Sequence, residues 1–233
     1  IAALKAHLRD KLITWATYTN WCFGCPNQYP DPKDPRLPMS EPRLTALADR
    51  DSIPQWTLSA IVRKRPLPLS AWLDDGAPKA ALGDEFWPQG RKPSMPRNTG
   101  FMHQASQWWA DGSVDRYRVA VSTFKEGCLR GWRSGLEGIS IHGEVTSRCI
   151  PYALNYLAFS HFTHWPEDTL RQFGRQTLGQ VLGGEREGEQ FVEYLAAWDG
   201  KALTDSQKRD IRAKAGKLDA AVGGHGQVEQ LWP

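Results

Sequence analysis

The sequence predicts an α/β fold, a (β/α) barrel of which this chain supplies the last four βα units, followed by C-terminal helices. Four short segments rich in β-branched and aromatic residues alternate with helical patterns in the first 150 residues, which is typical of parallel strands covered by helices. Long loops with polar and aromatic residues follow these segments, as they do at the catalytic face of barrel enzymes. No glycine-rich phosphate-binding fingerprint follows any of them, which disfavours a dinucleotide-binding sheet.

The elements are expected in the following order. Strands are predicted over residues 11–21, 53–62, 99–108 and 136–145. Helices are predicted over residues 1–10, 42–51, 69–73 and 115–134, and a Pro- and Asp-rich loop over residues 22–40. After Pro151 the pattern is helical to the end, with a helix that stops before Pro166, another capped by Thr169 and a stop at Gly183.

The chain has too few predicted strands to form a complete barrel. A complete barrel needs eight strands and about 250 residues, whereas this chain of 233 residues offers four strand segments. Because the chain begins with Ile1 and not with Met, we expect a processed or partial chain that lacks the first half of the barrel. Residues 1–165 would then form the second half of the barrel, and residues 166–233 a helical extension packed on it. A four-stranded sheet with helical additions is the alternative.

The composition limits the classes of partner and cofactor that the chain is expected to bind. The chain has 29 Lys and Arg against 26 Asp and Glu, and an excess of three does not favour nucleic-acid binding. No apolar run approaches the roughly 18 residues of a membrane span, so a soluble protein without membrane contact is expected. Cys22 and Cys25 form a CxxC motif, but Cys128 and Cys149 do not form the second close pair of a zinc site. Neither a metal nor another cofactor is therefore expected.

The segment GISIHGEVTSR, residues 138–148, carries the best catalytic candidate. Side chains alternate between the two faces of a strand, so Ser140, His142 and Glu144 share one face, opposite the apolar face of Ile139 and Ile141. A carboxylic acid near the carboxyl end of a barrel strand can protonate a leaving oxygen or attack a sugar carbon. A salt bridge from this glutamate to an arginine is the structural alternative.

Polar and aromatic residues at the other strand ends are candidates for substrate binding. The segment HQASQWW brings amides, a histidine and tryptophans to one strand end, and amides both donate to and accept from sugar hydroxyl groups. The chain has 11 Trp, whose flat apolar face and N–H suit sugar rings. We expect His103 to act as an acid or base, and the substrate to contact His142 and the residues Asn20, Trp21, Gln104, Gln107, Trp108, Asn155 and Tyr156.

A glycosidase normally pairs two carboxylates. Glu144 is one, and the loop after the second strand offers Asp74, Asp75, Asp84 and Glu85, none of which its position distinguishes. The second group would come from this loop, from His103 or from the missing half.

The runs RNTGFMHQASQWW and GLEGISIHGEVTSRCIPYALNYLAFSHF, with THWPEDTLRQF after them, resemble the C-terminal half of bacterial barrel-type glycoside hydrolases. The resemblance spans about residues 97–195 and is diffuse, so it points to no single family. It implies an enzyme that acts on a terminal, acidic or N-acetylated sugar, as sialidases do.

We therefore expect a glycoside hydrolase that uses acid/base catalysis at the carboxyl ends of the strands. Its partners would be a carbohydrate substrate and either the missing half of the protein or a second copy of the chain. Two alternatives remain open. One is a carbohydrate-binding barrel domain without catalysis. The other is a metal-dependent hydrolase that uses His103, His142 and Glu144, since histidines and carboxylates can also hold zinc.

Overall fold

The structure is a computed structural model of the chain. It describes residues 11–16, 30–31, 34–38, 49–57, 67–76, 95–102, 119–141, 150–198 and 204–222, and every structural statement below concerns these residues.

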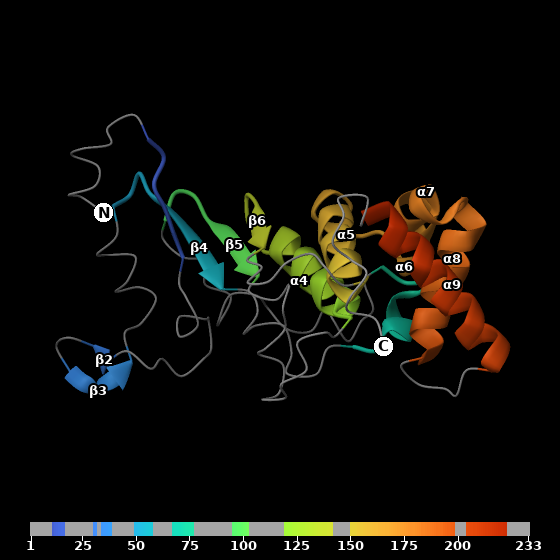
Figure 1. Cartoon of the computed structure of the whole chain (residues 1–233). Coiled ribbons are helices and arrows are strands. Elements are labelled where there is room, and N and C mark those ends of the chain that lie inside the picture. The colour runs from blue at the N-terminus through green and yellow to red at the C-terminus, as the bar shows by residue number, and fades with distance from the viewer. Residues whose placement is uncertain are drawn as a thin grey trace.

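A four-stranded parallel sheet forms one end of the described structure (Figure 1). Its strands are β1 (Thr14–Ala16), β4 (Ile53–Thr57), β5 (Thr99–Met102) and β6 (Ile139–Ile141). Each lies within one of the four segments predicted to be strands, and they pair side by side in chain order. The α/β class is thus confirmed, and the order of these strands has no reversal point of the kind that doubly wound sheets use for ligands.

A small hairpin interrupts the segment that was predicted to be a loop. Strands β2 (Pro30–Asp31) and β3 (Asp34–Pro38) pair antiparallel, with Pro30 opposite Pro38. The prediction of an unbroken loop over residues 22–40 is therefore wrong at these positions. Proline fixes the backbone angle φ near the extended region and is accepted in a two-stranded ribbon, where one edge of each strand needs no partner.

One face of the sheet packs against helix α4 (Val121–Arg133). The Ile139 side chain reaches so close to Gly131 that a Cβ there would lie 2.5 Å from Ile139 Cδ1. On the same face, Trp15 and Trp56 meet edge to face with their ring centroids 5.9 Å apart. These two tryptophans therefore belong to the packing between sheet and helices.

The helical part of the chain begins with α5 (Ile150–His164), which ends before Pro166 as predicted. A continuous helical segment follows, which consists of α6 (Leu170–Phe173), the π-helix η3 (Gly174–Leu178) and α7 (Gly179–Leu182). Thr169 caps its start through a capping box, and Gly183, with φ of 102°, ends it; both predictions are confirmed. Helices α8 (Glu185–Trp198) and α9 (Asp205–Val222) complete the helical part.

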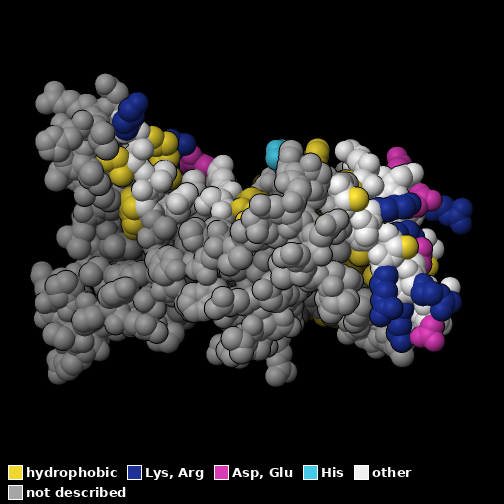
Figure 2. All heavy atoms as spheres, in the orientation of Figure 1, with side chains coloured by type: hydrophobic (Ala, Val, Ile, Leu, Met, Phe, Trp, Pro, Cys, Tyr) yellow, Lys and Arg dark blue, Asp and Glu magenta, His cyan; other side chains and the backbone are white. Residues whose placement is uncertain are grey.

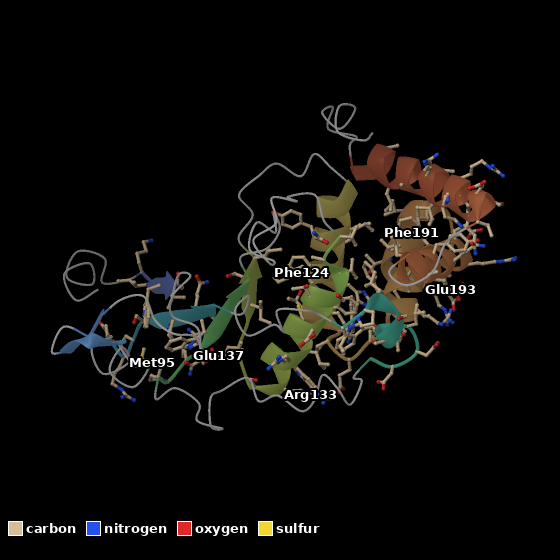
Figure 3. All side chains as sticks on the ribbon, turned by 90° about the horizontal axis from the view of Figure 1, so that it is seen from below. Met95, Phe124, Arg133, Glu137, Phe191 and Glu193 are labelled. Atoms are coloured by element: carbon tan, nitrogen blue, oxygen red, sulfur yellow. The ribbon has the colours of Figure 1, made fainter. Side chains whose placement is uncertain are left out.

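A single apolar core connects the two parts. It runs from Trp56 on the sheet through Trp72 of the short 3-10 helix η1 (Leu69–Trp72) and Phe124 of α4 to Phe191 of α8. Figure 3 labels Phe124 and Phe191 on their helices. The helices beyond residue 165 thus share a core with α4 and η1. None of the described helices has the length and apolar character that a membrane crossing needs.

Candidate functional site at the polar face of the sheet

The sheet face that turns away from α4 carries the polar residues Gln55 and Ser140, together with the buried Ile53. Gln55 of β4 donates a hydrogen bond from Nε2 to Ser140 Oγ of β6, at 3.3 Å. Ile139 and Ile141, on either side of Ser140, pack against the apolar core. The predicted alternation of this strand is therefore confirmed over its three described residues.

The hydrogen bond joins strands that are not neighbours, because β5 lies between β4 and β6. Gln55 pairs in register with Thr99 of β5, and Gly100, the next residue, pairs with Ile139 of β6. Since Thr99 precedes Gly100, it is level with Gly138, which precedes Ile139. Along the line that runs at right angles to the strands, Gln55 is therefore level with Gly138. Ser140 lies two residues beyond Gly138, and two steps between neighbouring strands lead from β4 to β6. The hydrogen-bonded pair is therefore staggered by one residue for each such step.

Most of the residues predicted for the site lie outside the described residues. These are the catalytic candidates Glu144 and His103 and the binding candidates Asn20, Trp21, Gln104, Gln107, Trp108 and His142. The described part of the sheet does reach the positions directly before two of them. Met102 and Ile141 are partners in the register of β5 and β6, and they precede His103 and His142 in the sequence.

Asn155 has a different position from the one predicted. Its side chain is fully buried, and its Oδ1 accepts a hydrogen bond of 2.7 Å from the backbone N–H of Ala120, directly before α4. Because the side chain has no exposed surface, the prediction that it binds sugar at a rim is wrong. Asn155 instead satisfies one of the N–H groups that every helix leaves unpaired at its start.

Tyr156, the next residue on α5, is half-buried. Burial raises the pKa of its hydroxyl group above the ordinary value, so this group is protonated at neutral pH and can donate a hydrogen bond. Of the predicted site residues that the structure describes, Tyr156 has a polar hydroxyl group on a side chain that is partly exposed to solvent.

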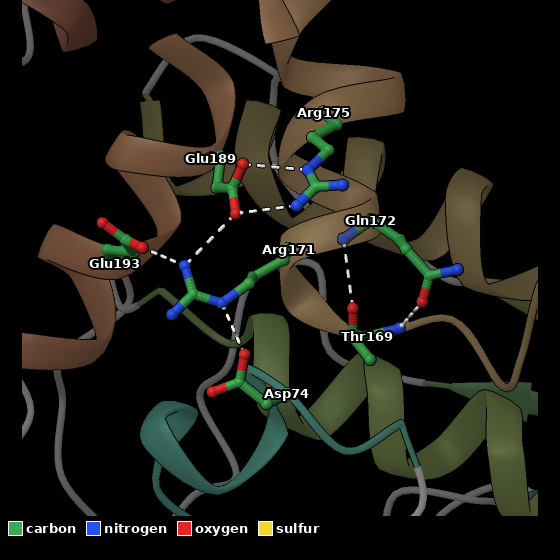
Figure 4. A network of polar contacts seen from close by, with 7 residues as sticks. All are labelled: Asp74, Thr169, Arg171, Gln172, Arg175, Glu189 and Glu193. Atoms are coloured by element: carbon green, nitrogen blue, oxygen red, sulfur yellow. Dashed lines mark hydrogen bonds and ion pairs between the residues drawn. The ribbon is translucent and has the colours of Figure 1, made fainter. Parts of the chain in front are cut away.

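Asp74, one candidate for a second carboxylate, forms an ion pair in the helical part of the molecule. Its Oδ1 lies 2.6 Å from Nε of Arg171, which also contacts Glu189 and Glu193 of α8 (Figure 4). The Asp74 carboxylate is held in this network by Arg171. Its position there indicates a role in the packing of η1 on the helices. Asp84 and Glu85 lie outside the described residues.

The sequence analysis missed a cluster of buried titratable side chains between α4, η1 and the turn that joins α5 to α6. Lys125 of α4 is fully buried, and this burial lowers the pKa of its ammonium group to about 8. Burial also lowers the pKa of His161 on α5 to about 4 and raises the pKa of Asp168 in the turn. Shifted pKa values of this kind gather at functional sites, although structural networks show them too.

The geometry of this cluster favours a structural role. His161 Nε2 and Asp168 Oδ2 lie 3.3 Å apart, yet neither atom makes a hydrogen bond, because the contact lacks the required alignment. His161 Nδ1 meets Thr177 Oγ1 of the π-helix at 2.9 Å. With Lys125 and His161 both buried, the cluster exposes only part of the Asp168 side chain to solvent.

The described residues also limit metal and thiol chemistry. No three His, Cys, Asp or Glu side chains among them are placed to hold a metal ion. Cys128 of α4 is buried, and burial raises the pKa of its thiol to about 12, so it is not a nucleophile at neutral pH.

Comparisons of the chain with models of protein families, with curated proteins and with solved structures find no match.

Proposed function

We propose that the chain is the second half of a (β/α) barrel and acts as a glycoside hydrolase on a terminal, acidic or N-acetylated sugar, with Glu144 as its acid/base or nucleophile. His103 would be a second proton-transfer group. The amide and indole groups after the strands would hold the sugar.

The staggered Gln55–Ser140 pair is the observation that carries this proposal. In an eight-stranded barrel with a shear of about eight, side chains of alternate strands meet in layers inside the barrel, and each strand crossed shifts the layer by about one residue. The pair has this stagger. On this reading Ser140 points into the barrel, and Glu144, four residues further along the same face, belongs to the strand end where barrel enzymes carry out their chemistry.

The substitution Glu144→Gln tests the proposal. We expect it to lower kcat on the best of a panel of aryl glycosides, which covers neutral, N-acetylated and acidic sugars, by on the order of 10²–10⁴-fold, the usual contribution of a general acid or base. Far-ultraviolet circular dichroism should remain unchanged.

Glu137→Gln is the matched control, since Glu137 is exposed before the start of β6 and pairs with Arg97 at 2.8 Å. It removes the same charge and should leave kcat unchanged. Equal rates in the wild type and the Glu144→Gln variant would exclude Glu144 from the mechanism. Sugar binding without turnover in the wild type would favour a carbohydrate-binding domain instead.

A metal-dependent hydrolase is the second candidate, because His103 and His142 directly follow two residues that are partners in the register of neighbouring strands. Imidazole groups at adjacent strand ends are suitable zinc ligands. Elemental analysis of the purified protein tests this: about one zinc per chain, lost in the double variant His103→Ala and His142→Ala, would favour the metal enzyme over the glycosidase.

A further inference from the structure

The outer strand β1 directs backbone groups away from the sheet. The N–H of Ile53 donates to the carbonyl of Ile13 at 2.9 Å, and Thr14 is the register partner of Ile53. Successive residues of a strand direct their N–H and C=O groups to opposite sides, so Ile13 and Trp15 point toward β4 and Thr14 points outward. Within the described part of the chain, no hydrogen bond reaches the N–H of Thr14.

Strand β6 has the same property at the opposite edge. The N–H of Gly100 donates to the carbonyl of Gly138 at 2.9 Å, so Gly138 and Ser140 point toward β5 and Ile139 points outward. Among the described strands, none pairs with this outer edge of β6. Such a row of unpaired backbone groups is a template to which another chain can add a strand.

The sheet face that carries Gln55 and Ser140 is partly open in a single copy, since both side chains are half-buried. Thr14 shares this face, because its partner Ile53 lies two residues before Gln55, and Thr14 is exposed. Leu12, two residues before Thr14, is 61% exposed, and hydrophobic side chains are visible at this end of the sheet in Figure 2. The interior of a barrel is a packed core, so a further part is needed to cover this face.

A second copy of the same sheet has the number and direction of strands that closure requires. Four parallel strands are half of an eight-stranded barrel. A two-fold axis along the barrel places β6 of each copy beside β1 of the other, and no edge is then left unpaired. The Gln55–Ser140 pair is staggered by one residue for each step between strands, and eight equal steps give the shear of about eight of such a barrel.

We propose that two copies of the chain pair β6 with β1 in this way and close one barrel. This assembly rests on the proposed function, since it takes the sheet as half of a barrel, and it names the partner. Glu144 follows the end of β6 by three residues, so each copy brings one Glu144 to the same mouth of the barrel. The partner copy thus supplies the second carboxylate that a glycosidase normally needs.

Gel filtration with light scattering tests the assembly, because it measures the mass of the purified protein in solution. We expect twice the 26.2 kDa of one chain. The mass of one chain, or a complex with a different polypeptide, would overturn the proposal.

Two substitutions of Thr14 test whether these edges form the contact. In Thr14→Lys the new ammonium group is exposed in a single copy but would be buried inside the closed barrel, where an unpaired charge is costly. In Thr14→Pro the outward N–H is lost at the first residue of an edge strand, where proline is tolerated. We expect both variants to have the mass of one chain and the circular dichroism spectrum of the wild type.

Thr14→Ser is the matched control, since it keeps the N–H and the hydroxyl group, and it should retain the mass of two chains. A Thr14→Lys variant that also retains this mass would place the contact elsewhere and overturn the proposal.

Mixed dimers test the shared mouth. Wild type and Glu144→Gln are unfolded, mixed in equal amounts and refolded together, with wild type refolded alone as the reference. About a quarter of the dimers then carry two intact glutamates, so we expect about a quarter of the reference activity on the aryl glycosides. Half of the reference activity would mean that each copy acts alone, and would overturn the shared mouth.

Failure of the assembly and failure of the proposed function give different results. A protein with the mass of one chain whose turnover is lost in Glu144→Gln would overturn the assembly and leave the glycosidase. A protein with the mass of two chains that separates in Thr14→Lys but turns over no glycoside would support the assembly and overturn the glycosidase.

Discussion

His161 combines a fully buried imidazole side chain with a pKa lowered to about 4 from an ordinary value of 6.5. Burial is the main cause, and the positive charge of Lys125 and the neighbouring His164 add to it. The folded chain therefore keeps this imidazole neutral down to about pH 4, whereas the unfolded chain protonates it below about pH 6.5. The free energy of unfolding contains a contribution from His161 that is complete above pH 6.5 and is lost as the pH falls toward 4.

We expect the substitution His161→Gln to remove this acid sensitivity. The shift of pKa corresponds to about 3 kcal/mol between pH 6.5 and pH 4, at about 1.4 kcal/mol per pH unit. Asp168, whose pKa is raised, acts with the opposite sign and reduces the net loss in the wild type. Urea unfolding at steps between pH 7 and pH 4.5 should therefore show a shallower decline in the variant than in the wild type.

His164→Gln is the matched control, since His164 lies on the same helix but is exposed. Its pH profile should stay closer to that of the wild type than to that of His161→Gln, because burial lowers the pKa of His161 more than the charge of His164 does. If the profiles of the wild type and His161→Gln were parallel over this range, His161 would not be the source of acid sensitivity.

At the scale of elements, α4 begins where α5 supplies its cap. Val119 and Ala120, which were predicted to be helical, precede the helix, and no local side chain caps its start. Asn155 of α5 accepts from the backbone N–H of Ala120 instead. The start of α4 therefore depends on tertiary packing, which a sequence pattern does not show.

Replacing this cap should destabilise the chain. Asn155→Ala leaves a buried N–H without its acceptor, so we expect the free energy of unfolding to fall by about 1–3 kcal/mol. The neighbouring substitution Tyr156→Phe removes a hydroxyl group from a half-buried side chain and should cost less than about 1 kcal/mol. Equal losses in urea unfolding of the two variants would contradict the role assigned to Asn155.

The sequence predicted those elements that depend on interactions between residues close together in the chain, and it missed those that depend on distant residues. Strands β1, β4, β5 and β6, the Thr169 cap and the stop at Gly183 depend on a few adjacent residues, and the sequence predicted them. The β2–β3 hairpin was missed because its prolines are typical of loops. The π-helix was missed because Gly174 and Thr177 form no local sequence signal. The cluster of Lys125, His161 and Asp168 joins residues up to 43 positions apart, so no local sequence motif predicts it.

At the scale of the whole molecule, the core is continuous from sheet to helices, and charges of both signs cover the C-terminal helices on the face seen in Figure 2. Arg171 contributes a connection at this surface. It joins Asp74, next to η1, to Glu189 and Glu193 of α8, and its backbone N–H donates to the carbonyl of Leu73 at 3.4 Å. The loop that follows β4 is thus fixed to the helices at this point.

We expect Arg171→Gln to loosen this connection. Exposed ion pairs contribute about 0.2–1 kcal/mol each, and Arg171 makes three at a side chain that is 27% exposed, so a loss of about 1–2 kcal/mol is expected. Hydrogen exchange should increase in residues 67–76, because the ion pair with Asp74 no longer holds this segment on Arg171 of α6. High salt should weaken the wild type toward the variant, since salt screens exposed charges.

Arg175→Gln separates this connection from a general effect of charge. Arg175 lies one turn beyond Arg171 and pairs with Glu189 at 2.8 Å. Among the described residues, no ion pair joins Arg175 to the η1 segment. Both variants lose one positive charge, but hydrogen exchange in residues 67–76 should change in Arg171→Gln alone. Equal changes in both variants would mean that long-range electrostatics, and not the Arg171 connection, holds η1 on the helices. A change confined to Arg171→Gln would mean that the Arg171 connection itself holds residues 67–76 on the helices after residue 165.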